Sequence, residues 1–145
     1  MELKEKNAGI KLEYSILKDD FSRAGEASSN IKKVLRQLGI DSSIIRRAAI
    51  ATYEAEINIV IHSEGGKIIV YIMPDKIEII AKDEGPGIED IELAMQEGFS
   101  TASNKVRELG FGAGMGLPNM KKSSDEFVIE SKKGESTIVK MIIYL

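Results

Sequence analysis

The stretch Tyr53–His62, YEAEINIVIH, decides how the rest of the chain is arranged. Its polar residues Glu54, Asn58 and His62 recur at every fourth position. On a helix this spacing places all three side chains on one face, one turn apart. The residues between them are mostly apolar, and polar groups are costly to bury among apolar ones unless they have partners. We therefore expect a helix whose polar stripe faces a ligand or a solvated surface.

Length, composition and charge limit the classes of protein to consider. A chain of 145 residues is long enough to bury a core, and we expect residues 1–145 to form one domain. Hydrophobic residues make up 43% and charged residues 30%, which is typical of a soluble globular protein. The net charge of −3 gives no electrostatic support for binding nucleic acid.

The sequence also excludes several kinds of site and location. The chain has no cysteine, which excludes disulfides, zinc–thiolate sites and thiol catalysis, and its one histidine excludes a histidine-rich metal site. No apolar run approaches the roughly 20 residues of a membrane span. The charged first residues, MELKEK, have no signal-peptide core. We therefore expect a cytoplasmic protein with no membrane partner.

Periodic patterns predict the secondary structure. Alternation over residues 10–18 predicts a strand with one buried face. Asp19 and Asp20 are candidate N-caps for a helix over 21–38, and a second helix is expected over about 41–62. Further strands are expected over 67–73, 76–82, 127–132 and 137–145, with short helices over 88–96 and 117–123.

The order of these elements indicates the fold class. Strands joined by hairpins favour a largely antiparallel sheet, and amphipathic helices between them are suited to cover one of its faces. We therefore expect an α+β fold, a two-layer α/β sandwich with a mixed, mostly antiparallel sheet and the helices on one face.

Residues 110–116, GFGAGMG, are the most glycine-dense stretch of the chain. Glycine permits positive φ and a close approach of backbone N–H groups to a ligand. The helix expected next has an N-terminus that favours anions, so the stretch predicts a phosphate site. A flexible loop without a ligand is the alternative. No Gly-Lys-Ser/Thr follows, which excludes a Walker A loop, and Met115 occupies the last glycine position of a dinucleotide fingerprint.

Asp83 ends an expected strand and is followed by Gly85 and Gly87. Its carboxylate can accept a hydrogen bond from the amino group of a base, while the glycines let a ring lie against the backbone. The alternative is an Asx turn, or a cap for the helix expected at residue 88. The sequence therefore predicts either a base-binding carboxylate or a local turn at this position.

The long helix offers two further groups for chemistry. The carbonyl oxygen of Asn58 suits Mg²⁺, and Glu54, one turn earlier, suits the role of general base. A solvated face with pairing between neighbouring turns is the alternative. For His62 we expect a structural role. Glu56 lies about 200° around the helix from Glu54, so we expect it on the surface.

The order of these features along the chain resembles the GHKL superfamily of ATPases, the gyrase, histidine-kinase and MutL type, with its Bergerat ATP-binding fold. Residues 54–62 match the N box, residues 83–88 the G1 box and residues 112–118 the G2 box. The resemblance covers about residues 10–145. Within the superfamily, the small size of the chain is similar to the bacterial anti-sigma-factor and switch-protein serine kinases.

The resemblance implies roles for the matched positions. Asp83 would bind the adenine amino group, Asn58 would coordinate Mg²⁺ bridging the phosphates of ATP, and Glu54 would be the general base. The other implied contacts to ATP are Gly85 and Gly87 at the adenine, Gly112, Gly114, Gly116 and Leu117 at the phosphates, Thr137 closing the site, and Arg107 in a lid over residues 98–109 as a γ-phosphate partner.

Two subfamilies share features with the chain. The N box is similar to the anti-sigma kinases, whereas residues 98–101 and 114–127 are similar to the stressosome-type switch kinases. Both imply phosphorylation of a serine or threonine on a STAS-domain antagonist. Three hypotheses follow: an anti-sigma factor kinase that also holds a sigma factor, with a homodimer as its usual form; a switch kinase with a non-sigma partner; and a non-enzymatic nucleotide-sensing module.

Overall fold

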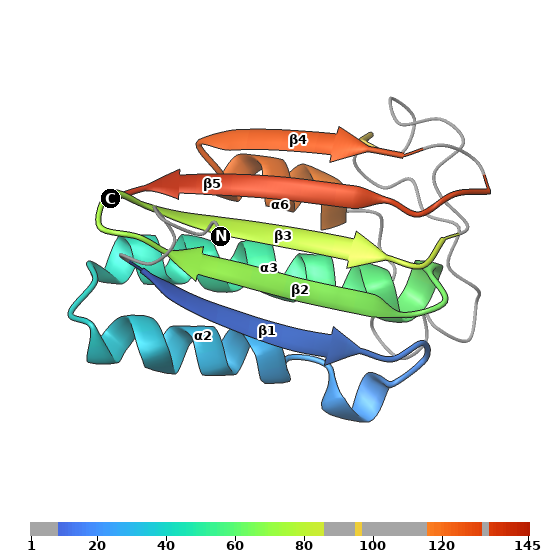
Figure 1. Ribbon diagram of the computed structural model, residues 1–145, viewed down its shortest axis with the longest axis horizontal. Helices are drawn as coiled ribbons and strands as arrows, with labels where there is room; N and C mark the ends of the chain where they lie inside the picture. The colour runs from blue at the N-terminus through green and yellow to red at the C-terminus, as the bar shows by residue number, and fades with distance from the viewer. Residues whose placement is uncertain (1–8, 86–94, 97–115, 132–133) are drawn as a thin grey trace.

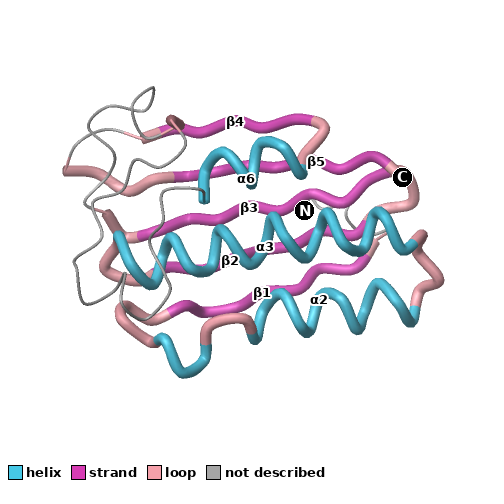
Figure 2. Tube along the Cα trace, turned by 180° about the vertical axis from the view of Figure 1, so that it is seen from behind, coloured by secondary structure: helices cyan, strands magenta, loops and turns pink. Residues whose placement is uncertain are grey.

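A five-stranded antiparallel sheet with helices along one face makes up the described part of the protein (Figure 1). The computed structural model describes residues 9–85, 95–96, 116–131 and 134–145. Figure 2, seen from behind, shows all the helices on the same side of the sheet. The elements are β1 (Ile10–Ile16), η1 (Phe21–Arg23), α2 (Glu26–Gln37), α3 (Ser42–His62), β2 (Gly66–Ile72), β3 (Lys76–Asp83), α6 (Gly116–Ser123), β4 (Glu126–Glu130) and β5 (Ile138–Tyr144). The predicted two-layer α+β fold is confirmed.

The strand order β1-β2-β3-β5-β4 brings three chain segments together at one end of the sheet. Gly66 at the start of β2 pairs with Asp83 at the end of β3. On the other side of β3, Lys82 pairs with Ile138 at the start of β5. Both figures show the end of β3, the C-terminal end of α3 and the beginning of α6 toward this same end. The topology thus gathers the polar residues singled out in the sequence.

Helix α3 lies at the centre of the helical layer, between α2 and α6, and it contacts β1, β2, β3 and β5. Its sheet-facing side carries small residues, because Ala48, Ala51 and Ala55 are all buried. Small side chains let the helix lie close to the isoleucine-rich inner face of the sheet. The fully buried side chains of the sheet are Ile68, Val70, Ile77, Ile79, Met141 and Ile143. None of the described helices has the length and apolarity needed to cross a bilayer.

The helix predicted over residues 21–38 is two elements, and of the two candidate N-caps only Asp20 takes an N-cap position, at the start of the first element. A short 3₁₀ helix, η1, ends before Gly25, whose φ of 100° interrupts the helical path, and α2 begins at Glu26. Asp20 makes no side-chain cap bond. Asp19 has a φ of 59°, and its N–H donates to the Val60 carbonyl at 3.0 Å. Such a left-handed conformation is uncommon outside glycine and turns the chain sharply onto the end of α3.

The prediction that Glu56 lies on the surface is also wrong. Its side chain points away from Glu54, as helical geometry requires, but α2 covers that side of α3, and Glu56 is only 2% exposed. The Ala27 N–H, in the first turn of α2, donates to Glu56 Oε2 at 3.4 Å. Desolvation raises the pKa of the Glu56 carboxyl. The carboxylate therefore serves one of the free N–H groups at the beginning of α2.

The remaining elements follow the sequence prediction closely. The four strands expected after α3 are present, each with ends within two residues of those expected. The helix expected over 117–123 begins one residue earlier, at Gly116. Of the helix expected over 88–96, only residues 95–96 belong to the described part of the chain. The order β-α-α-β-β before this point, and α-β-β after it, is as predicted.

Candidate functional site

Helix α3 presents Glu54 and Asn58 to the beginning of α6. The Asn119 side-chain amide donates to Glu54 Oε2 at 3.0 Å. A Cβ atom built on Gly116 would lie 2.9 Å from Asn58 Oδ1 and 3.7 Å from Glu54 Oε1. The first residue of α6 thus lies against both polar side chains, and only a residue without a side chain fits there undisturbed.

The donor set around Asn58 fits a hard cation. Asn58 Oδ1 and the Glu54 carboxylate are oxygen ligands, the type that Mg²⁺ prefers, and both side chains are partly exposed. Among the described residues, no three Asp, Glu or His side chains cluster as they would in an all-protein metal centre. Mg²⁺ commonly binds through one or two protein groups together with substrate phosphates, which is the arrangement that this site can support.

A second polar group forms where β3 ends beside β5. Asp83 Oδ1 accepts hydrogen bonds from the Gly85 N–H at 2.8 Å and from the Thr137 N–H at 2.9 Å. The Asp83 N–H in turn donates to the Thr137 carbonyl at 3.0 Å. The bond to Gly85 is the local turn that the sequence left open. Both side-chain bonds go to Oδ1, and no described residue forms a hydrogen bond to Oδ2.

Thr137 is held firmly beside Asp83. Its side chain is 5% exposed, and its Oγ1 lies 2.5 Å from the hydroxyl oxygen of Ser131. Gly85 is buried as well and has a φ of 105°, a conformation that side chains rarely adopt. The Asp83 carboxylate is therefore fixed through Oδ1 by two backbone N–H groups, while none of the described residues bonds its Oδ2.

The turn after α3 joins the two polar groups through backbone hydrogen bonds. The Glu64 N–H donates to the Gly85 carbonyl at 3.0 Å, and the Glu84 N–H donates to the Gly65 carbonyl at 2.8 Å. At the last turn of the helix, the Ser63 hydroxyl lies 2.8 Å from the Ile59 carbonyl and accepts from the Gly65 N–H at 3.1 Å. These bonds connect the end of the helix that carries Asn58 to the loop that begins at Asp83.

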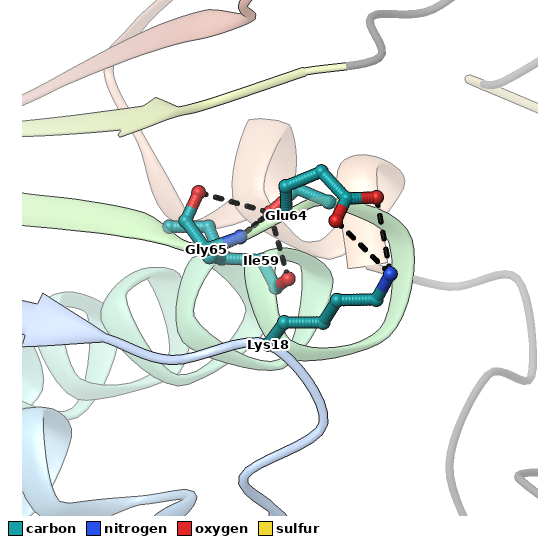
Figure 3. Close-up of polar contacts among 5 residues, drawn as sticks. Lys18, Ile59, Glu64 and Gly65 are labelled. Atoms are coloured by element: carbon teal, nitrogen blue, oxygen red, sulfur yellow. Dashed lines mark hydrogen bonds and ion pairs between the residues drawn. The ribbon is translucent and has the colours of Figure 1, made fainter.

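An exposed ion pair involves the same turn after α3. Lys18 Nζ donates to both carboxylate oxygens of Glu64, at 3.0 and 3.1 Å, and Figure 3 shows the two side chains facing each other. Both side chains are largely exposed, so the pair contributes little to stability. Its effect is geometric, because it links the segment after β1 to the turn after α3.

The structure places most of the predicted site residues in these two groups. Glu54, Asn58 and Gly116 come together between α3 and α6, and Asp83, Gly85 and Thr137 come together at the end of β3. The Leu117 side chain packs into the core and is 6% exposed. The remaining predicted residues, Gly87, Arg107, Gly112 and Gly114, lie outside the described residues.

His62, the last residue of α3, is exposed at the surface, although the protein around its ring still desolvates it and lowers the pKa of the imidazole. Its structural role remains a prediction.

Asn119 is the site residue that the sequence prediction missed. It follows Gly116 by three residues, so on a helix it shares the face that Gly116 turns toward α3. This spacing was a usable signal. If Gly116 lies close to the polar residues of α3, then Asn119, one turn later on the same face of α6, should also lie close to them.

Comparisons with known proteins identify the family of the chain. The family model described as "Histidine kinase-like ATPase domain" matches residues 17–143. The serine/threonine-protein kinase RsbT of Bacillus subtilis is 35% identical over 118 residues, which cover 79% of this chain and 83% of RsbT. The anti-sigma F factors of Caldanaerobacter subterraneus and of Thermoanaerobacter sp. are 40% and 41% identical over 100 residues, and the match spans 66% of each chain in both cases. Together with the sheet order and the two polar groups, these matches show that the chain belongs to the histidine kinase-like ATPase domain family.

Proposed function

We propose that this protein binds ATP with Mg²⁺ and transfers the γ-phosphoryl group to a serine or threonine of a STAS-domain antagonist, as an anti-sigma factor with protein kinase activity. The observation that carries the proposal is the approach of Gly116 to both Asn58 and Glu54. This approach supports the proposal because the Asn58 amide oxygen, which could bind a cation, and the Glu54 carboxylate, which could act as a base, both lie at the first turn of a helix, where phosphate oxygens bind favourably.

Adenine recognition is assigned to Asp83. Its Oδ1 is occupied by the Gly85 and Thr137 N–H groups, so Oδ2 is the oxygen that would accept the adenine amino group. Gly85, fixed by its bond from Glu64, would form one wall of the adenine pocket, and Thr137 would close the pocket on the β5 side. Gly87 belongs to the same pocket in this proposal.

Phosphate binding and chemistry are assigned to the group between α3 and α6. Asn58 Oδ1 would hold Mg²⁺, which when bound neutralises charge on the phosphates. Glu54 would accept the proton of the substrate hydroxyl as the new O–P bond forms and the bond to the ADP oxygen breaks. Gly112, Gly114, Gly116 and the backbone of Leu117 complete the phosphate cradle in this proposal, with Arg107 at the γ-phosphate.

The partner distinguishes two versions of the same activity. Relatives named anti-sigma F factor favour a chain that also holds a sigma factor. RsbT, named a serine/threonine-protein kinase, matches over a larger share of the chain and favours a switch kinase with a different partner. Capture of partners by the purified protein in ATP or in ADP separates the two, because a sigma factor is expected only in the first version.

The Glu54→Ala variant tests the proposal directly. With labelled ATP and the STAS-domain protein of the same genome, we expect transfer to fall at least about 100-fold, while ATP affinity measured by calorimetry stays within about twofold. Glu26→Ala, an exposed carboxylate on α2, is the control and should transfer at the normal rate. Transfer that survives in Glu54→Ala would remove Glu54 as the base. ATP binding without transfer in the wild-type protein would favour the nucleotide-sensing module instead.

A further inference from the structure

Asn119 is the described hydrogen-bond partner of the carboxylate that the proposed function assigns as base. Its amide lies 3.0 Å from Glu54 Oε2. The other oxygen, Oε1, is the one that faces Gly116, at 3.7 Å from the position where a Cβ would stand. The two oxygens of Glu54 are therefore in different environments, one bonded to the Asn119 amide and the other near Gly116 at the start of α6.

We propose that Asn119 is a positioning residue that fixes the Glu54 side chain so that Oε1 points at the substrate hydroxyl. A glutamate has three side-chain torsions and loses catalytic efficiency if it samples several of them. An amide donor suits this task because it is neutral. A lysine or arginine in the same place would pair with the carboxylate and weaken it as a base, whereas an amide holds one oxygen and leaves the charge in place.

The packing of α6 makes Asn119 a firm support. Its neighbours Leu117 and Met120 are buried in the core, at 6% and 1% exposure, so the helix cannot rotate without opening the core. The far end of α6 is tied back to α3 by Arg47, which donates to the Ser123 carbonyl at 3.1 Å and pairs with Asp125 at 2.9 Å. The Asn119 amide is therefore delivered from a rigid element, which is what precise positioning requires.

This inference rests on the proposed function, and its kinetic test separates the two. Turnover is measured with labelled ATP and the STAS-domain protein, and ATP affinity by calorimetry. We expect Asn119→Ala to lower kcat about 10-fold with ATP affinity within about twofold, and Asn119→Gln, which keeps the amide, to recover part of the loss. Lys121→Ala, an exposed residue of the same helix, is the control and should leave kcat unchanged.

A double-variant cycle tests whether Asn119 acts through Glu54. In the Glu54→Ala background, adding Asn119→Ala should cause no further loss of turnover, because nothing is left to position. A further 10-fold loss would mean that Asn119 acts independently, and would overturn the inference. Turnover that depends on Glu54 but is unchanged in Asn119→Ala would overturn it while leaving the proposed function intact. Absence of turnover in the wild-type protein would overturn both.

A spectroscopic readout needs no turnover. In ¹⁵N-labelled full-length protein, the side-chain NH₂ signal of Asn119 should shift when Glu54→Ala removes its acceptor. Asn30 is the internal control, because its Oδ1 accepts from the Tyr14 hydroxyl at 2.5 Å on a different part of the surface, and its NH₂ signal should not move. An Asn119 signal that is the same in wild type and Glu54→Ala would contradict the hydrogen bond on which the inference depends.

Discussion

Glu56 shows how a single buried carboxylate shapes the helical layer. It connects α3 to the first turn of α2 through the Ala27 N–H, and its second oxygen, Oε1, has no hydrogen-bond partner among the described residues. Thr52, one turn earlier on the same face of α3, is also buried with its hydroxyl unpartnered in the described structure. Buried polar atoms without partners cost free energy, so these two atoms lower the stability of the protein relative to a junction in which both are hydrogen-bonded.

The raised pKa of Glu56 has a definite consequence for stability against pH. The pKa of this carboxyl is about 4.5 in the unfolded chain, and desolvation raises it in the folded protein. Between these two values the folded state binds more protons, so stability falls as pH rises through that window. Glu56→Gln keeps a carbonyl acceptor for Ala27 and carries no charge. We expect it to raise the free energy of unfolding by about 1 kcal/mol at pH 7 and by nothing at about pH 4.

Urea denaturation at the two pH values measures this difference. Glu26→Gln, at the exposed carboxylate of the first residue of α2, is the matched control and should change stability by less than about 0.5 kcal/mol at either pH. An equal gain for Glu56→Gln at both pH values would show that its benefit comes from packing and not from removal of a buried charge.

At the scale of elements, α6 is the part of the structure on which the site depends most. It brings Gly116 to Asn58 and Asn119 to Glu54, so two successive positions of one helix face meet the polar stripe of α3. Its other face supplies Met120 and Leu117 to the core. A helix of eight residues thus has both of its faces committed, one to stability and one to the candidate site.

Gly116→Ala should separate these two tasks. A Cβ at this position would lie 2.9 Å from Asn58 Oδ1, so Asn58 must move away from the proposed cation. Alanine is the better helix former by about 1 kcal/mol, which offsets the strain on folding. We expect ATP to bind about 10-fold more weakly in the presence of Mg²⁺, with the midpoint of urea denaturation little changed. Calorimetry with Mg²⁺ and with EDTA measures the effect, and an affinity equal to that of wild type in Mg²⁺ would contradict the assignment of Asn58.

The elements that the sequence predicted well are those with a strong local pattern. The isoleucine-rich strands and α3 have residue patterns that predict them directly, and the fold buries their apolar residues between the sheet and the helices. The division of residues 21–38 was missed because nothing in the local pattern shows that Gly25 takes a left-handed conformation. Glu56 was misplaced because helical spacing gives the direction of a side chain and not what covers it. For Glu56 the deciding partner lies on another element, α2.

At the scale of the whole molecule, the candidate site consists of two polar groups, one in each layer of the fold. The group around Asn58 belongs to the helical layer, and the group around Asp83 belongs to the sheet. The turn at residues 63–65 joins the layers through its bonds to Gly85 and Glu84. The sequence predicted Asp83 and Asn58 from chemistry and motif order, but this junction was not predictable, because it depends on how the end of α3 meets the end of β3.

A ligand that binds both polar groups, and therefore only the folded chain, should stabilise the whole fold. At a concentration of 100 times Kd, ATP with Mg²⁺ should add about 2.7 kcal/mol and raise Tm by about 5–10 °C. In Asp83→Asn, the new Oδ1 still accepts from Gly85 and Thr137, but an NH₂ group replaces Oδ2, where an acceptor for adenine is needed. We expect the unliganded Tm to be nearly unchanged and the shift with ATP to be largely lost. Thermal scans with and without ATP measure both, and a full shift in this variant would contradict the adenine assignment.

The strand order also has a consequence for how fast the chain folds. Two of the four strand pairings, β2 with β3 and β4 with β5, join neighbouring segments, and these can form early. The other two join residue 16 to residue 66 and residue 82 to residue 138. Each of these must close a long stretch of chain before any pairing energy is gained, which raises the contact order and slows the search. We therefore expect the pairing of β3 with β5, which brings Thr137 to Asp83, to form late in folding.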